Sequence, residues 1–180
     1  FHDTHYNPSF WNFERELSDS NSNLETIHKA MNNVHDYAIS QYKSVKGYVR
    51  KIDPDKQIHI GELGWATKSS GNYGENGSHA ADEYKQAVFH DKIRDWTKKE
   101  KIACFYFSAF DENWKDFLNV NGSENHFGLL TVDGKAKYAL WKNVDNGDFN
   151  DLTRNGNSIT KTYNGNSENL LNNIYQYHTK

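Results

Sequence analysis

The chain has 180 residues and a formal net charge of −3, with acidic and basic residues interspersed along its length. That length suffices for one domain with a buried core, and it falls short of the about 250 residues of a complete (β/α)8 barrel. The charge pattern lacks the basic stripe typical of a nucleic-acid-binding protein. The longest apolar run, Ala103–Phe107, is far shorter than the roughly 20 residues of a membrane-spanning helix. We therefore expect no nucleic-acid partner and no membrane-spanning segment.

Aromatic residues make up 14% of the chain although hydrophobic residues as a whole reach 36%. This combination predicts a polar surface with many half-exposed rings, which suits contact with carbohydrate. The single cysteine, Cys104, lies in the apolar run IACFYF, and we expect it to be a buried small hydrophobe. One cysteine cannot form an internal disulfide, so the redox compartment stays undetermined.

The first half of the chain predicts a strand, a helix and a second strand. Residues 1–6 have a strand-like pattern that opens into a turn at Asn7-Pro8. The sequence from Ser22 to Glu25 is a capping box, and the apolar residues behind it repeat every three or four positions up to about Asp53-Pro54. Ile58–Leu63 then reads as the second strand, with His59 buried in it.

The second half predicts a helix from about His79 to Lys99 and a third strand at Ala103–Ala109. A short strand or turn at His126–Val132 and a helix around residues 138–141 follow. Strands that alternate with helices of this length indicate βαβ units in a parallel sheet. Three units make an unfinished fold, because the outermost strands would stand uncovered.

The end of the chain differs in composition from the rest. Residues 143–180 are polar and rich in Asn and Gly, which predicts a linker or irregular tail with a weak helical patch at residues 170–175. We therefore divide the chain into a folded part, residues 1–142, and a tail, residues 143–180.

Two consecutive predicted strands end in glutamates. Glu62 closes the first, and Glu112 follows the other, with Lys115 three residues further on. The ends of neighbouring barrel strands meet at one face, so these groups should share one cleft. The opposite charge of Lys115 keeps Glu112 ionised, which makes Glu112 a poor general acid. The plainer interpretation is that both glutamates are solvated acids that close their strands.

Other side chains near these strand ends have two interpretations. Trp11, Trp65 and Trp114 could provide flat faces for sugar rings or could pack in the core. His2 and His5 alternate to opposite faces of a strand, so we expect no metal site there.

Three ordered blocks decide between these interpretations. GELGWAT, FYFSAFDENWK and ENHFGLLTVDGKAKY, between residues 58 and 141, strongly resemble glycoside hydrolase family 17, the β-1,3-glucanase family on a (β/α)8 TIM barrel. HYNPSFW at residues 5–11 is similar to the preceding strand end of that family. The resemblance implies an α/β fold in which this chain forms the C-terminal portion, about strands 6–8 of the barrel.

The resemblance also implies roles for individual residues. It makes Glu62 the catalytic nucleophile, Glu112 and Lys115 substrate-binding groups, and Glu124 a member of the same polar network. The remaining expected lining of the cleft is aromatic: Tyr6, Trp11, Trp65, Phe110 and Trp114.

Three departures from the family pattern are visible. Ser108 stands where an acid is common, and Ala66 stands where proline is common after Gly-Trp. The third is larger: the general acid of the family lies in an Asn-Glu motif on an earlier strand, and no such motif precedes Glu62 in these residues. The chain then carries the nucleophile without its catalytic partner, and we expect residues 1–180 alone neither to hydrolyse glucan nor to fold cooperatively.

The implied reaction is retaining cleavage of laminarin-like β-1,3-glucan, which needs no cofactor and no metal. Two alternatives remain open, a β-1,3-glucan transglycosylase on the same scaffold and a non-catalytic glucan-binding module. The expected partners are a β-glucan and the missing N-terminal half of the barrel, which a second chain could supply. The substrate class implies an extracellular or cell-envelope location.

Overall fold

The computed structural model describes residues 23–69 and 80–174. The predicted strand at residues 1–6, and with it Tyr6 and Trp11, lies outside the described residues. The chain forms two compact units. Unit 1 consists of Phe1–Leu63 and Lys92–Phe105, and unit 2 of Gly64–Asp91 and Tyr106–Lys180.

Unit 1 is built on the long helix α3, Asn23–Ile52. Its buried side chains repeat at helical spacing and form one apolar stripe: Ile27, Ala30, Met31, Val34 and Ala38. The helix ends because Pro54 cannot continue it, and the last helical hydrogen bond runs from the Asp53 amide to the Val49 carbonyl, 2.9 Å. The predicted helix is thus confirmed over its described length.

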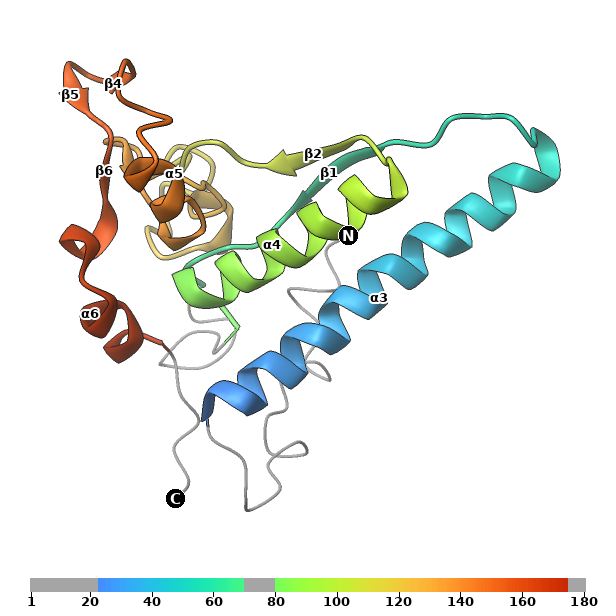
Figure 1. Cartoon of the computed structure of the whole chain (residues 1–180), viewed down its shortest axis with the longest axis horizontal. Helices are drawn as coiled ribbons and strands as arrows, with labels where there is room; N and C mark the ends of the chain where they lie inside the picture. Colours follow the sequence, from blue (N-terminus) through green and yellow to red (C-terminus); the bar gives the residue numbers. More distant parts are fainter. Residues whose placement is uncertain (1–22, 70–79, 175–180) are drawn as a thin grey trace. The chain divides into compact units, whose positions relative to one another are not determined.

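Strand β1, Ile60–Gly64, and strand β2, Cys104–Phe107, pair in a two-stranded sheet, and α4, Glu83–Glu100, connects them (Figure 1). Within unit 1 the Ile60 amide donates to the Ala103 carbonyl at 2.9 Å. These elements confirm the expected order of strand, helix and strand. Each begins one to four residues later than the sequence predicts.

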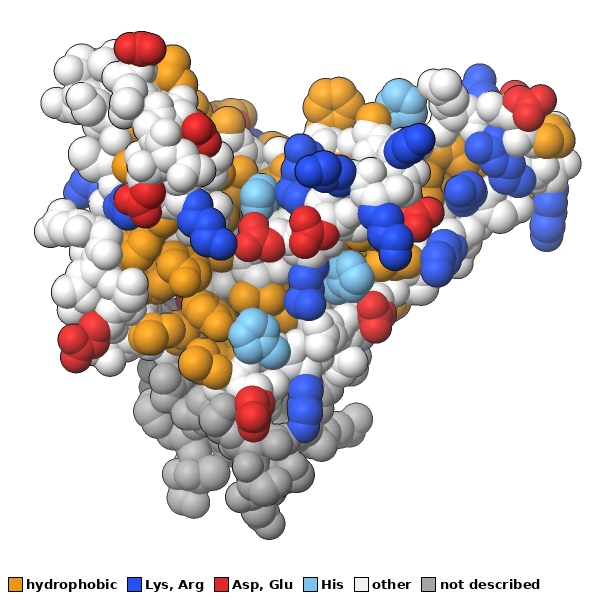
Figure 2. Space-filling view, in the orientation of Figure 1, with side chains coloured by type: hydrophobic (Ala, Val, Ile, Leu, Met, Phe, Trp, Pro, Cys, Tyr) orange, Lys and Arg blue, Asp and Glu red, His pale blue; other side chains and the backbone are white. Residues whose placement is uncertain are grey.

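Helices α3 and the unit 1 part of α4 pack through their aromatic residues. The rings of Tyr42 and Trp96 meet edge to face, with centroids 5.3 Å apart. Charged side chains of both signs lie on the visible outer surfaces of the two helices (Figure 2).

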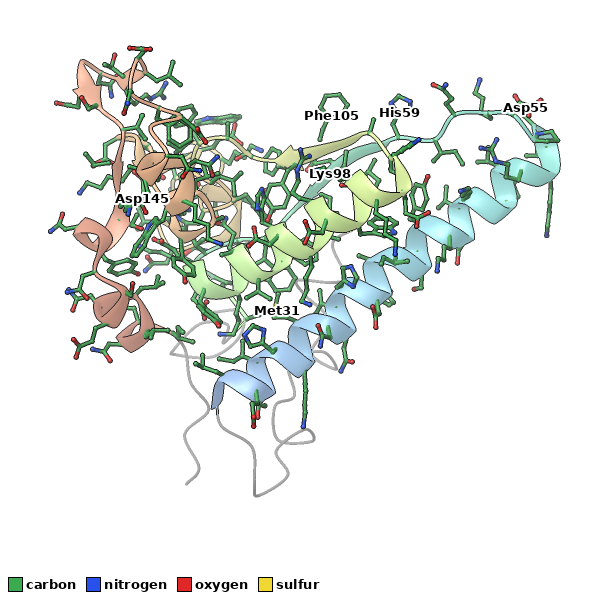
Figure 3. All side chains as sticks on the ribbon, in the orientation of Figure 1. Met31, Asp55, His59, Lys98, Phe105 and Asp145 are labelled. Carbon is green, nitrogen blue, oxygen red and sulfur yellow. The ribbon has the colours of Figure 1, made fainter. Side chains whose placement is uncertain are left out.

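The other face of the strand pair in unit 1 is open in the described part of the chain. Phe105 and His59 both point away from α3 and α4 (Figure 3), and Phe105 is 67% exposed. The prediction of a buried His59 is therefore wrong, because the residue precedes β1 on this uncovered side. Cys104 is half-buried rather than fully buried.

Unit 2 contains a ladder of short backbone pairings that begins just after β2. Phe110 bridges Leu130 in parallel, and Leu130 bridges Ala136 in antiparallel. Strand β3, Lys135–Ala136, pairs in parallel with β6, Thr160–Lys161. The ladder thus joins the segment that follows β2 to residues 160–161.

The range predicted as a linker or irregular tail has regular structure in its described part. After the short helices η4, Tyr138–Leu140, and α5, Trp141–Asp145, it forms a hairpin of β4, Thr153–Arg154, and β5, Asn157–Ser158. Asn155 and Gly156 have φ angles of 52° and 79°, as a two-residue type I′ turn requires.

The remaining helices of unit 2 are short. They are η3, Ser123–Asn125, then η5, Thr162–Gly165, and finally α6, Ser167–Asn172. The side chain of Asn166 caps α6 by accepting a hydrogen bond from the Asn169 amide at 2.9 Å. This helix lies where the sequence predicts only a weak helical patch.

No helix among residues 23–69 and 80–174 is both long and apolar enough to cross a lipid bilayer.

Candidate active site

Glu62 is the central residue of β1 and does not close the strand as predicted, and its side chain is exposed. No hydrogen bond or ion pair joins its carboxylate to another described residue. In unit 1 it borders a hollow of about 330 Å³, lined mostly by apolar residues of α3 and of the β1 segment, among them Tyr42, Val45 and Ile58. A carboxylate with water on one side and apolar surface on the other is available to a ligand.

The end of β1 in unit 2 requires glycine. A Cβ atom on Gly64 would lie 1.9 Å from the carbonyl oxygen of Phe107, so any side chain there would force the two segments apart. The peptide bond that follows Phe107, to Ser108, is cis. Gly64 therefore allows the last residues of β1 and β2 to approach each other closely.

Trp65 follows directly and is fully buried, with 0% of its surface exposed. Its ring packs on Phe89 with centroids 4.9 Å apart, and its Nε1–H donates to the Ala80 carbonyl at 2.9 Å. A ring without exposed surface offers no face to a sugar in this conformation. Of the two interpretations of Trp65, the structure agrees with packing in the core.

Gln86, which sequence reasoning missed, holds the same region from α4. Its Nε2 group is within hydrogen-bonding distance of three carbonyl oxygens, those of Trp65 at 2.8 Å, Gly128 at 3.0 Å and Phe127 at 3.3 Å. The residue is fully buried. One side chain thus fixes the segment after β1 against the segment at residues 127–128.

A second clamp in unit 2 is the ion pair of Lys137 with Asp111. Lys137 Nζ lies 2.7 Å from Asp111 Oδ1 and also donates to Thr67 Oγ1 at 2.8 Å. The Gly128 amide donates to the same Asp111 oxygen at 2.9 Å. Burial lowers the pKa of Lys137, and Asp111 opposes this shift. The pair ties together loops from three parts of the sequence.

Glu112 and Lys115 form the pair that the sequence predicts as substrate-binding. Lys115 Nζ lies 2.9 Å from Glu112 Oε2, and the two side chains are 24% and 27% exposed. The ammonium group also lies 4.1 Å from the ring centroid of Phe107 and 5.8 Å from that of Trp114. The loop after β2 therefore carries an acid, a cation and the ring of Trp114, next to the ring of Phe107 at the end of β2.

Trp114 is 70% exposed, which leaves its ring accessible in the described structure. Loops that recognise sugars commonly combine such a ring with hydrogen-bonding groups. Asn125 holds this loop in place through two hydrogen bonds to Asp116. Its Oδ1 accepts from the Asp116 amide at 2.8 Å, and its Nδ2 donates to the Asp116 carbonyl at 2.8 Å.

The other predicted site residues are placed as follows. Glu124 lies in the first turn of η3, half-buried, and makes no hydrogen bond to another described residue. Phe110 is half-buried and its ring faces the guanidinium of Arg154. No group of three or more His, Cys, Asp or Glu side chains in the described part of the chain is arranged to hold a metal ion.

The strands β1 and β2 are joined by a helix, and the loop after β2 carries an ion pair and an exposed tryptophan. The chain belongs to glycosyl hydrolases family 17, whose family model matches residues 49–141, just over half of the chain. The fold is accordingly of the TIM-barrel type.

Three known proteins illustrate the similarity. The crystal structure of an endo-laminarinase from Formosa Hel1_33_131 is 55% identical, covers 99% of this chain and 47% of its own, and superposes with a TM-score of 0.86. A glucan 1,3-beta-glucosidase of Arthroderma benhamiae is 36% identical over 88 residues, which are 45% of this chain and 27% of that protein. An acidic glucan endo-1,3-beta-glucosidase of Nicotiana tabacum is 34% identical over 90 residues, 48% of this chain and 24% of the relative.

The chain spans about half the length of the endo-laminarinase, 47%, and about a quarter of these two curated relatives, 27% and 24%.

Proposed function

We propose that this chain is part of a retaining glycoside hydrolase that cleaves laminarin-like β-1,3-glucan. The observation that carries the proposal is the 55% identity to an endo-laminarinase over 99% of this chain. Similarity at that level over nearly every residue supports a shared reaction far better than the family alone. The chain would supply about strands 6–8 of the barrel, and the complete enzyme is this chain together with the remaining barrel strands.

Glu62 is the proposed nucleophile. Its exposed carboxylate has no partner among the described residues, so it keeps its lone pairs for attack on the anomeric carbon of a glucosyl unit. The new C–O bond replaces the glycosidic bond, and the leaving sugar takes a proton from a carboxylic acid on a strand outside these 180 residues. Water then attacks the anomeric carbon, gives its proton to the carboxylate left by that acid, and displaces Glu62, so the second inversion restores the β configuration.

Glu112 and Lys115 bind the substrate in this proposal. An ion pair of 2.9 Å joins them, and the carboxylate of Glu112 can accept hydrogen bonds from sugar hydroxyls. Exposed Trp114 supplies an apolar face for a sugar ring. Tyr6, Trp11, Phe110 and Glu124 are proposed to complete the binding surface.

Trp65 acts in a different way from the other aromatic residues. Because the ring is buried and hydrogen-bonded to Ala80, we assign it to the support of the residues after β1. The hydrogen bonds of Gln86 and the ion pair of Lys137 with Asp111 also support the residues after β1. Such support matters because the position of a catalytic carboxylate must be fixed to within a fraction of an ångström.

The reaction needs carboxylates and hydrogen bonds but no cofactor. Laminarin-like glucan is a polysaccharide found outside the cell or in the cell envelope. We therefore propose an extracellular or cell-envelope location for this protein.

The test replaces Glu62 in the complete enzyme. We expect Glu62→Gln to reduce the release of reducing ends from laminarin by a factor on the order of 10⁴, since it removes the nucleophile. Glu100→Gln is the matched control, because Glu100 is exposed at the end of α4, and it should leave the rate unchanged. Equal activity of Glu62→Gln and the wild type would refute the assignment.

The stereochemistry gives an independent check. NMR spectra recorded early in the reaction should show the β anomer of the new reducing end, and Glu62→Ala with added azide should give an α-glucosyl azide. Early accumulation of the α anomer would point to an inverting enzyme instead.

A further inference from the structure

The hairpin of β4 and β5 lies beside the residues that follow β2. The ladder of unit 2 runs from Phe110 through Leu130 and Ala136 to Lys161. Only Ile159 separates the hairpin from β6, the last strand of this ladder. The hairpin therefore continues directly into the last strand of the ladder that contains Phe110.

Arg154 of this hairpin is held from two sides. Its guanidinium carbon lies 4.4 Å from the ring centroid of Phe110, and its Nε–H donates to the Val132 carbonyl at 3.2 Å. A Cβ atom on Gly134, whose φ is +89°, would lie 2.6 Å from the Cβ of Arg154. The side chain thus packs closely against glycine, which leaves it little freedom.

The edge of the guanidinium remains available. An arginine side chain has five N–H donors in one plane, and the described residues accept one of them, at Val132. The remaining donors belong to a half-buried, preorganised fork. A planar guanidinium group can bind two neighbouring acceptors at once. Because the Arg154 side chain is already held in one conformation, a ligand would not have to restrict it further on binding.

The surroundings favour an uncharged ligand. Asn155, Asn157 and Ser158 are exposed, and the β4 and β5 region is largely white in Figure 2, which denotes uncharged polar side chains and backbone. Exposed Asp133 follows Val132 directly, and exposed Asp151 precedes the hairpin, so an anion would meet carboxylates near the fork. Uncharged oxygen atoms of a sugar match this environment better.

We infer that Arg154, whose guanidinium lies over the ring of Phe110, forms a sugar-binding subsite that holds two neighbouring oxygen atoms of a glucosyl unit of the substrate chain, a hydroxyl group and the glycosidic oxygen beside it. The inference rests on the proposed function and adds a residue from the segment beyond residue 142. Because Phe110 is two residues from Glu112 in the sequence, the subsite extends the binding surface along the glucan. It therefore contributes to long substrates and not to the bond-cleaving step.

The test measures KM and kcat of the complete enzyme for β-1,3-linked glucose trimers and hexamers. We expect Arg154→Ala to raise KM for the hexamer about tenfold, the typical effect of losing a charged hydrogen bond, with kcat and the trimer KM changed less than about twofold. Arg154→Lys keeps the charge without the planar fork and should lose most of the same affinity. Arg94→Ala is the matched control, because Arg94 is exposed on α4, and it should behave as the wild type.

Calorimetric titration of the hexamer into the Glu62→Gln enzyme measures binding without turnover. Arg154→Ala in that background should weaken binding about tenfold. Unchanged hexamer KM, equal losses for trimer and hexamer, or a fully active Arg154→Lys would each overturn the subsite. These results leave the proposed function intact as long as the wild type cleaves glucan, whereas a wild type inactive on β-1,3-glucan removes the proposed function itself.

Discussion

The ammonium group of Lys137 and the carboxylate of Asp111 lie 2.7 Å apart, and their side chains are 3% and 8% exposed. The pair joins the segment after β2 to the segment that leads into η4, and Thr67 Oγ1 accepts from the same ammonium at 2.8 Å. A buried pair is expensive to break because the remaining charge keeps no counterpart. It is therefore a point at which the stability of unit 2 can be tested.

We expect Lys137→Met to lower the free energy of unfolding of the complete enzyme by about 3–5 kcal/mol, because Asp111 is left buried and unpaired. The double variant Lys137→Met with Asp111→Asn should recover part of that loss. Denaturant titration measures both values. Equal stability of Lys137→Met and the wild type would contradict the structural role of the pair.

Gly64 gives a sharper steric test. Gly64→Ala should lower the free energy of unfolding by about 2 kcal/mol or more, because its Cβ would meet the Phe107 carbonyl oxygen at 1.9 Å. Gly61→Ala is the control in the same strand, since a Cβ at Gly61 meets nothing within 4 Å. Thermal unfolding of the two variants, measured together, should place Gly61→Ala at the wild-type melting temperature.

The buried environment of the Glu83 carboxyl group predicts that the stability of the folded protein depends on pH. Its Oε2 accepts from Thr162 Oγ1 at 2.7 Å and from the Tyr138 amide at 3.1 Å. Burial raises the pKa of Glu83 above its ordinary value of 4.5, although hydrogen bonds from Thr162 and Tyr138 and the charge of Lys137 oppose the shift. Protonation of this group therefore favours the folded state, and its contribution to stability is lost as the pH rises through the raised pKa.

The variant Glu83→Gln does not titrate, so its melting temperature relative to the wild type should increase between about pH 4 and pH 8. Scanning calorimetry at several pH values measures this difference. A difference that is constant or that falls with pH would be inconsistent with a raised pKa. Glu168→Gln, at an exposed position of α6, controls for the loss of a carboxylate.

Lys115 is expected to matter for binding and catalysis more than for stability. Lys115→Met leaves Glu112 without its cation and removes the charge above the Phe107 ring, and we expect kcat/KM on laminarin to fall about 10- to 100-fold. Lys142→Met is the control, because Lys142 is exposed on α5. Unchanged kcat/KM would show that Glu112 needs no cation for its role.

Residues 1–180 produced alone should release no reducing ends from laminarin, because the general acid is proposed to lie on other strands. They should also unfold without a sharp transition, since one face of the β1–β2 pair is uncovered in the described residues. Detectable hydrolysis by the isolated chain would require an acid among these 180 residues.

The local sequence pattern was enough to predict the helices and strands that bury one regularly spaced set of apolar side chains. The apolar repeat of α3 and the strand signals around Glu62 and Phe105 correspond to observed elements. The order of GELGWAT and FDENWK likewise predicted the family. These features are encoded within a few residues, and sequence reasoning reads such signals directly.

The clamps were not predictable because they depend on contacts between distant positions. Gln86 meets carbonyl groups about 20 and 40 residues away, at sequence separations of 21, 41 and 42, and nothing in its local sequence marks it. The hairpin around Arg154 was hidden in a stretch whose Asn and Gly content resembles a linker. Those residues serve a type I′ turn here.

The ladder from Phe110 to Lys161 also bears on how this protein can be shortened or recombined. Ending the polypeptide near residue 142 would remove β6, which pairs with β3, and the Thr162 hydroxyl that donates to Glu83. It would also remove Arg154, whose guanidinium lies over the ring of Phe110. A chimaera with a related enzyme should therefore exchange residues 83–174 as a single block, with its crossover placed outside that range.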